Sequence, residues 1–248
     1  MNKQTLYKNT LTNKGVTSDI CDYKIKRASD SISCSYCNKE ISHSASYEDG
    51  RELCKKCFDN SVHTQEEALE FLPKLINDMK KFGIDCQNMN IPLRLINRKS
   101  MEHESKSLKN FIPIGLTSRY NLNSYNSSRQ IVHREPVIDS VLILNGLSVT
   151  DFCMTLVHEL GHCWIHHQDF PQLEPYVEEG LCELLSCIWL KQQNIPERGQ
   201  KIQNLLNYSS DVYKKGLNRA MIALKDYSFK EIIQYISLKG IFPPRYYN

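Results

Sequence analysis

The sequence lacks any hydrophobic run long enough to cross a lipid bilayer. Its longest apolar runs are short, and residues 141–144 are typical of them, whereas a membrane-spanning helix needs about 20 apolar residues. No apolar stretch follows Met1, so we expect no secretory signal and a cytoplasmic protein. The phosphate-loop pattern G-x-x-x-x-G-K-[ST] and the dinucleotide pattern G-x-G-x-x-G are also missing, which argues against nucleotide chemistry.

The charge of the chain is nearly balanced. It contains 31 Lys and Arg and 28 Asp and Glu, which give a formal net charge of +3 over 248 residues. So small an excess gives no reason to expect nucleic acid or a membrane surface as partner. Apolar residues make up 41% of the chain, enough to bury a core, so we expect a folded protein. Its length allows one large domain or one domain with a small module.

Four of the ten cysteines form two Cys-x-x-Cys pairs, Cys34 with Cys37 and Cys54 with Cys57. Disulfides are improbable in a reducing cytoplasm, and two such pairs are typical of a zinc site. Four thiolates close a tetrahedral site, so this zinc is predicted to be structural, holding together a module too small to fold unaided. The alternative is a set of reduced surface thiols or a disulfide. The other cysteines show no ligand spacing, and we interpret them as small buried hydrophobic residues.

The sharpest motif is H-E-x-x-H, formed by His158, Glu159 and His162. Residues four apart lie on one face of a helix, so the two imidazoles are predicted to hold one zinc ion with Glu159 beside a metal-bound water. The alternative is a helix with two histidines that bind no metal.

An open catalytic zinc site needs a third ligand, and the next helix offers Glu178, Glu179 and Glu183. The stretch 179–181 is similar to the third-ligand segment of many thermolysin-type peptidases, which favours Glu179. Glu183 is then expected to orient one of the zinc-binding histidines without binding the metal itself. Glu178 and Glu183 remain alternatives to Glu179 as the third ligand.

This His₂Glu set predicts hydrolysis of peptide bonds, with Glu159 as the general base that takes a proton from the zinc-activated water and returns it to the leaving amine. The oxyanion needs a further donor, for which Tyr213, Tyr176 and His133 are candidates. The strand predicted at 137–144 is expected to pair with an extended substrate.

The order of the predicted helices and strands along the chain indicates an α+β fold with three parts. Residues 1–30 are a polar arm, 31–64 the zinc module, and 65–248 a mainly helical, zincin-like metallopeptidase domain with a small sheet. Capping boxes begin helices at Thr64 and Ser228, and Pro73 is expected to kink or break the first of them. Residues 99–130 are predicted to be loops with one short element. Helices are expected near 150–168, 175–190 and 210–224.

Taken together, these segments resemble the LIM-domain-containing, ubiquitin-activated peptidases that limit organ growth in plants. The resemblance runs from the cysteine pairs and residues 141–147 through His158–Trp164 and 177–182 to 240–243. It implies a gluzincin-type zinc endopeptidase with a LIM-like module, and a similar Tyr-containing segment at 212–216 supports Tyr213. The acidic ubiquitin-interacting helices of the plant proteins have no counterpart here, so ubiquitin dependence is not carried over, and we expect a minimal bacterial homologue.

The predicted function is therefore a zinc metallopeptidase that carries one catalytic and one structural zinc ion and cleaves protein or peptide substrates. The alternative is an adaptor, in which the zinc module docks a protein partner and the peptidase domain is weak or inactive.

Overall fold

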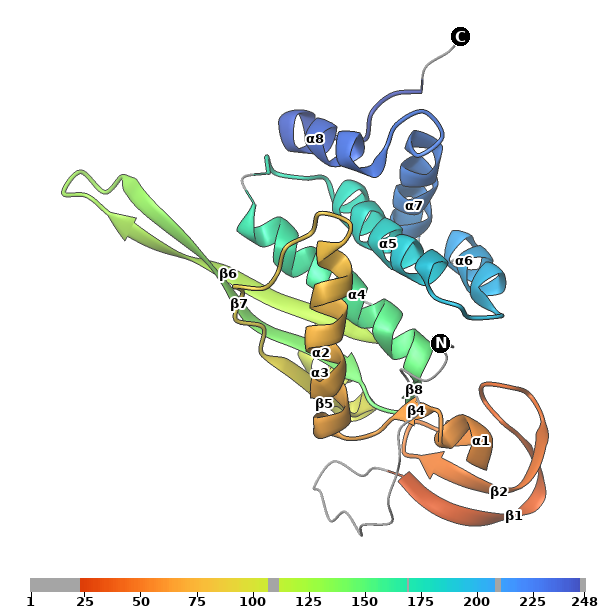
Figure 1. Ribbon diagram of the computed structural model, residues 1–248. Coiled ribbons are helices and arrows are strands. Elements are labelled where there is room, and N and C mark those ends of the chain that lie inside the picture. Colours follow the sequence, from red (N-terminus) through yellow and green to blue (C-terminus); the bar gives the residue numbers. More distant parts are fainter. Residues whose placement is uncertain (1–22, 107–111, 169, 208–210, 246–248) are drawn as a thin grey trace.

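A computed structural model describes residues 23–106, 112–168, 170–207 and 211–245 (Figure 1). Helices and small sheets alternate along this part of the chain, which confirms the α+β class. None of its helices has the length and hydropathy that crossing a bilayer requires. Cys21 lies outside the described residues.

The cysteine-rich segment forms a small sheet with one short helix at one end of the molecule (Figure 1). Its antiparallel strands are in the order β1-β2-β3, and their bounds with the helix are β1 (Tyr23–Ser33), β2 (Glu40–Tyr47), β3 (Glu52–Leu53) and α1 (Lys55–Phe58). The sheet begins at Tyr23, so the expected boundary at residue 30 between an arm and the module does not hold for this sheet. The buried apolar cluster of this segment is small, consisting of Cys34, Tyr47 and Leu53 with partly buried neighbours.

The larger part of the chain is built on a three-stranded sheet in the order β5-β7-β6. Strand β7 (Ile131–Leu144) is parallel to β5 (Leu93–Ile96) on one side and antiparallel to β6 (Gly115–Tyr125) on the other. Beyond the sheet, β6 and β7 continue as a long hairpin that projects from the body of the molecule (Figure 1). Apolar residues at its far end, such as Tyr125 and Val132, are exposed.

Two sequence predictions fail in this sheet. Residues 99–130 were expected to be mainly loops, yet they hold the eleven-residue strand β6 as well as α3 (Arg98–Glu104). The strand escapes prediction because most of its residues are exposed on both faces and give no apolar alternation. Residues 137–144 were expected to pair with an extended substrate, but residues 141–143 pair with β5 and β6 at once, which leaves β5 and β6 as the two edge strands of this sheet.

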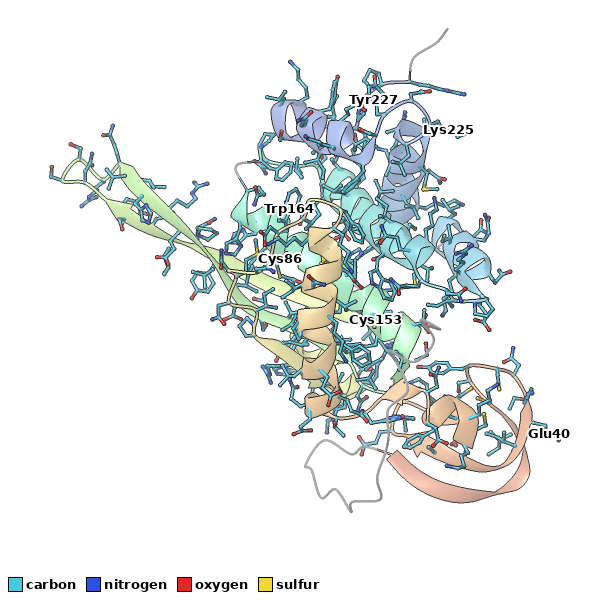
Figure 2. The ribbon with its side chains drawn as sticks, in the orientation of Figure 1. Glu40, Cys86, Cys153, Trp164, Lys225 and Tyr227 are labelled. Atoms are coloured by element: carbon cyan, nitrogen blue, oxygen red, sulfur yellow. The ribbon has the colours of Figure 1, made fainter. Side chains whose placement is uncertain are left out.

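The helices form layers on this sheet. Helix α4 packs on β6 and β7 and against α2; α5 packs on α4, and α7 on α5 (Figure 1). The bounds are α2 (Gln65–Lys80), α4 (Val149–His167), α5 (Pro175–Gln192), α6 (Arg198–Leu206), α7 (Asp211–Ala223) and α8 (Phe229–Lys239). Cys86 and Cys153 are fully buried and Trp164 nearly so (Figure 2). Cys163, Cys182 and Cys187 are buried too, as the interpretation of the unpaired cysteines predicts.

The predicted helix starts at Thr64 and Ser228 are confirmed, because each residue forms a capping box. At the start of α4, the side chain of Ser148 accepts a hydrogen bond from the amide of Asp151. The break expected at Pro73 is wrong, because α2 continues through it. Pro73 deprives the carbonyl of Leu69 of its helical donor, but Leu69 lies on the exposed side of α2, where water can replace that bond.

The cysteine-rich segment is attached to the strand-to-helix turn that leads into α4. β4 (Ser61–Val62) pairs with β8 (Leu147–Ser148), and β8 ends at the N-cap of α4. The hydroxyl of Tyr36 donates to the carbonyl of Gly146 at 2.6 Å, and the guanidinium of Arg51 donates to the carbonyl of Asn145 at 3.0 Å. The cysteine-rich segment therefore holds the turn from which the H-E-x-x-H helix starts.

Candidate metal centre

Helix α4 brings the two motif histidines together in a buried position. His158 is 9% exposed, and its Nε2 lies 3.1 Å from Nε2 of His162, one turn later. Apolar residues surround this part of α4, with Leu156, Val157 and Leu160 fully buried. A helix buried to this depth fixes the two imidazoles relative to each other before any metal arrives.

The carboxylate of Glu179, on α5, lies close to Nε2 of both histidines. Its Oε2 lies 3.1 Å from Nε2 of His158 and 3.5 Å from Nε2 of His162. Tetrahedral zinc with bonds of about 2.0–2.1 Å holds its ligand atoms about 3.3–3.4 Å apart, so these three spacings fit a zinc ion. Burial alone raises the pKa of Glu179, but hydrogen bonds from both histidines outweigh it and lower this pKa below its ordinary value.

The other nitrogen of each histidine faces a carboxylate. Nδ1 of His162 lies 2.7 Å from Oε1 of Glu178, and Nδ1 of His158 lies 3.4 Å from Oε1 of Glu183. Such partners hold Nδ1 in the protonated form and leave the Nε2 lone pair for a metal. The three glutamates of α5 thus take different places: Glu179 faces Nε2 of both rings, whereas Glu178 and Glu183 lie behind one ring each.

Arg119 of β6 ties this edge strand to both helices. One of its nitrogens pairs with Glu178, and another donates to the main-chain carbonyl of His162 at 3.0 Å. Burial raises the pKa of Glu178, but the hydrogen bond and charge of His162, and then the charge of Arg119, outweigh it and lower this pKa. Arg119 could not be predicted as a site residue, because nothing in the surrounding polar segment indicates that it lies on a strand.

The side chain of Glu159 extends from α4 toward the start of β6. It is 5% exposed, and its Oε2 accepts a hydrogen bond of 2.7 Å from the hydroxyl of Thr117. Gly115 lies against the same carboxylate: a Cβ added there would come within 2.5 Å of Oε1 of Glu159 and of a methyl of Thr155. The main chain of β6 therefore approaches Glu159 as closely as a glycine allows.

A cavity of about 140 Å³ opens beside Glu159 and His158. Tyr213 of α7 lines it, with its ring centroid 6.1 Å from that of His158. Burial raises the pKa of Tyr213, and the charges of Glu179 and Glu159 raise it further, so its hydroxyl keeps its proton. Neither of the other oxyanion candidates lines this cavity: Tyr176 packs under Lys215, and His133 is exposed on the β6–β7 hairpin.

Cys182 is a further donor that the sequence analysis missed. Donor atoms of His158, His162 and Cys182 all lie within 4.8 Å of one another, so this trio also fits a metal. The thiol is fully buried, and burial raises its pKa to about 12. The available signal was its place one turn after Glu178 on the same helix. Glu179 and Cys182 are thus rival third ligands.

The four paired cysteines form a second candidate centre, as their spacing predicts. One sulfur from each of Cys34, Cys37, Cys54 and Cys57 lies within 4.8 Å of the other three. Sγ of Cys37 is 3.8 Å from Sγ of Cys54, close to the spacing of about 3.8 Å that tetrahedral Zn–S bonds of about 2.3 Å imply. Burial raises the pKa of Cys34, but backbone amides, first that of Cys54, outweigh it and lower this pKa to about 6, which favours the thiolate that binds a metal.

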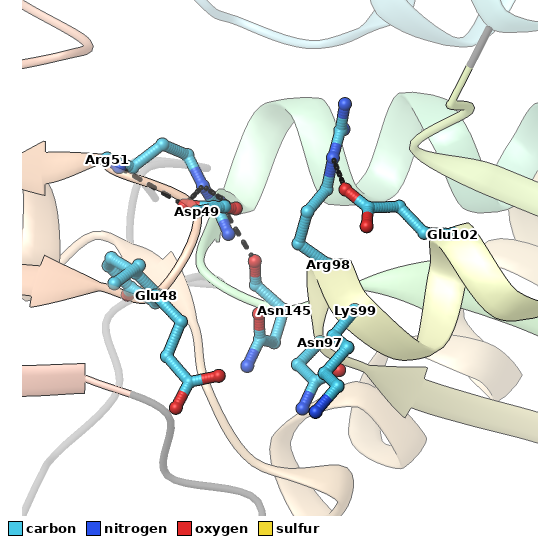
Figure 3. A pocket seen from close by; sticks show the side chains of 9 residues that line it. Glu48, Asp49, Arg51, Asn97, Arg98, Lys99, Glu102 and Asn145 are labelled. Atoms are coloured by element: carbon cyan, nitrogen blue, oxygen red, sulfur yellow. Dashed lines mark hydrogen bonds and ion pairs between the residues drawn. The ribbon is translucent and has the colours of Figure 1, made fainter. Parts of the chain in front are cut away.

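A larger cavity of about 370 Å³ lies where the cysteine-rich segment meets the turn before α4 (Figure 3). Its walls carry charged side chains, but the basic ones are largely neutralised: Arg51 pairs with Asp49 at 2.8 Å, and Arg98 with Glu102 at 3.7 Å. It contains neither of the two donor clusters, so the chemistry of the molecule points to the smaller cavity.

Part of the chain that forms this site is similar to a known protein family. Residues 100–205 match the family described as DA1-like, and this stretch includes the two histidines, Glu159 and Glu179 but not Tyr213 or the paired cysteines. The chain is 22% identical to Protein DA1-related 2 of Arabidopsis thaliana over 85% of its own length, and 21% identical to LIM domain-containing protein HDR3 of Oryza sativa subsp. japonica over 85%. It is 20% identical to Protein DA1 of Arabidopsis thaliana over 79%.

These alignments cover 51%, 54% and 46% of the three relatives, so the chain spans about half the length of the curated proteins it matches. No solved structure matches it. The comparisons confirm the resemblance that the sequence predicts: part of the chain matches the DA1-like family, and the chain is similar to Protein DA1 and Protein DA1-related 2 of Arabidopsis thaliana.

Proposed function

We propose that this protein is a zinc-dependent metallopeptidase that hydrolyses peptide bonds in protein substrates. The observation that carries the proposal is the convergence of Nε2 of His158, Nε2 of His162 and Oε2 of Glu179 at spacings of 3.1 to 3.5 Å. Two imidazoles and a carboxylate are the ligand set of thermolysin-type zinc enzymes. The resemblance to the LIM-domain-containing peptidases of plants supports the proposal.

Each residue of the site has a chemical task in this proposal. His158, His162 and Glu179 would hold a zinc ion, which would supply the Lewis acidity that lowers the pKa of water and polarises a peptide carbonyl. Glu159 accepts the proton of the attacking water at its carboxylate and delivers it to the leaving amine. The hydroxyl of Tyr213 donates a hydrogen bond toward the oxygen on which negative charge develops. Glu178 and Glu183 keep the histidines oriented.

The surroundings favour a polypeptide substrate. Strand β6 pairs with β7 on one side only and begins at Gly115, directly against Glu159. The outer side of such a strand offers main-chain hydrogen bonds to an extended peptide. The role that the sequence analysis gave to residues 137–144 therefore passes to β6.

Metal analysis of purified protein tests the metal centre. We expect two zinc ions per chain in the native protein and one in His158→Ala, because the four cysteines keep theirs. A native protein that contains a single zinc ion, unchanged in His158→Ala, would show that the histidine cluster binds no metal.

The third ligand is tested by two variants in the same helix. Glu179→Ala is expected to weaken zinc binding at the histidine site by at least about 10-fold and to remove activity, whereas Cys182→Ala should keep both within about 3-fold. Zinc affinity by competition with a chromogenic chelator and cleavage of a denatured protein such as casein are the measurements. The reverse pattern would make Cys182 the ligand and would contradict the His₂Glu centre.

A further inference from the structure

Helices α5 and α7 cross with their backbones in contact at a pair of glycines. A Cβ added to Gly180 would lie 2.5 Å from the carbonyl carbon of Gly216. A Cβ added to Gly216 would lie 2.2 Å from the carbonyl oxygen of Tyr176 and 2.8 Å from Cα of Gly180. Cβ atoms do not approach other atoms closer than about 3.0 Å, so a side chain at either position requires the helices to move apart.

This crossing lies between two groups of the candidate site. Glu179 immediately precedes Gly180 on α5, and Tyr213 lies three residues before Gly216, on the neighbouring turn of α7. Tyr213 is a wall of the cavity that also contains His158 and Glu159. The separation of the two helix backbones therefore sets how far the phenol of Tyr213 reaches into that cavity.

We propose that Gly180 and Gly216 are positioning residues, whose close contact holds the hydroxyl of Tyr213 at the distance that the reacting carbonyl requires. The proposal rests on the peptidase function. Relieving the 2.2 Å approach to at least 3.0 Å moves α7 by about 0.8 Å. A displacement of about 1 Å in a catalytic group can cost about 100-fold in rate.

Gly216→Ala is the direct test. We expect its kcat for a peptide substrate to fall by about 10- to 100-fold, its KM to stay within about 3-fold, and its zinc content to be unchanged, since α4 and α5 carry the ligands. The matched control is Gly199→Ala on α6, where an added Cβ meets nothing within 4 Å and where we expect native kinetics.

A second readout needs no activity. In protein labelled with 3-fluorotyrosine, the ¹⁹F signal of Tyr213 is identified as the one missing in Tyr213→Phe. That signal should shift in Gly216→Ala and stay in place in Gly199→Ala. If the native protein cleaves no peptide, the peptidase proposal fails, but the fluorine shift still shows whether the crossing positions Tyr213.

The third test asks whether Gly216→Ala and Tyr213→Phe lower kcat independently of each other. In a Tyr213→Phe background, Gly216→Ala should lower kcat by less than about 2-fold, because the group it displaces is already absent. Full additivity of the two losses, or an unmoved fluorine signal, would overturn the proposal. Failure of both Gly216→Ala and Gly180→Ala to fold would overturn it too, because the half-exposed α7 is expected to yield to one methyl group.

Discussion

Glu159→Gln should bind zinc at the histidine site as the native protein does and yet lose peptide hydrolysis by about 10²- to 10⁴-fold, the contribution typical of a general base. The amide has the shape of the carboxylate and still accepts the hydrogen bond from Thr117, so the local structure is kept. It cannot take up a proton, so water is no longer activated. Metal analysis combined with steady-state cleavage of a protein substrate measures both halves of this result.

The control for this variant is the same substitution at Glu66→Gln, an exposed glutamate in the first turn of α2. It removes one negative charge far from the cavity and is expected to leave turnover unchanged. Native turnover in Glu159→Gln would contradict the role of Glu159 as general base. The adaptor function would be favoured instead if the native protein itself showed no turnover.

Cys54→Ser should remove the structural zinc ion and unfold the cysteine-rich segment before it affects catalysis. The buried apolar cluster of that segment consists of Cys34, Tyr47 and Leu53, too little to hold a fold of this size without help. Zinc binding in such modules contributes roughly 10–16 kcal/mol. We expect zinc to fall from two ions to one, with a separate, lower unfolding transition and reduced solubility.

The loss of stability should then spread, through the turn before α4, to the part of the chain that carries the histidine cluster. Tyr36 and Arg51 donate hydrogen bonds to the carbonyls of Gly146 and Asn145, and Ser148 begins the motif helix directly afterwards. Tyr36→Phe removes one of these bonds and leaves the cysteines intact, so it serves as the control, with an expected cost of about 1 kcal/mol and full zinc content.

Calorimetry of the two variants, with and without a chelator, measures these effects. A Cys54→Ser protein that unfolds like the native one and loses only the binding of a protein partner would refute the structural role of this zinc. That result would favour docking as the task of the cysteine-rich segment.

Local pattern predicted the parts of the site that lie within one helix or one turn. The spacing of His158 and His162 puts both rings on one face because the period of a helix is fixed, and the cap at Ser148 marks where that helix begins. The Cys-x-x-Cys pairs predicted their cluster for the same local reason, because each pair lies within one turn.

Other features depended on contacts between elements that are far apart in the chain. Strand β6 has little apolar alternation, so neither the strand nor its residues Thr117 and Arg119 were predicted, although both reach α4. Cys182 looked like any buried thiol, and only the packing of α5 on α4 places it beside His162.

The amino-acid sequence by itself determined which groups have metal-binding chemistry, how they are spaced along each helix and which family they resemble, because these depend on residue type and helical period alone. The tertiary structure decided which carboxylate faces both Nε2 atoms, which strands lie at the edges of the sheet, and how closely Gly180 and Gly216 let α5 and α7 approach. Those outcomes are set by how whole elements pack, and a packing distance between distant segments is a property of the assembled core rather than of any local pattern.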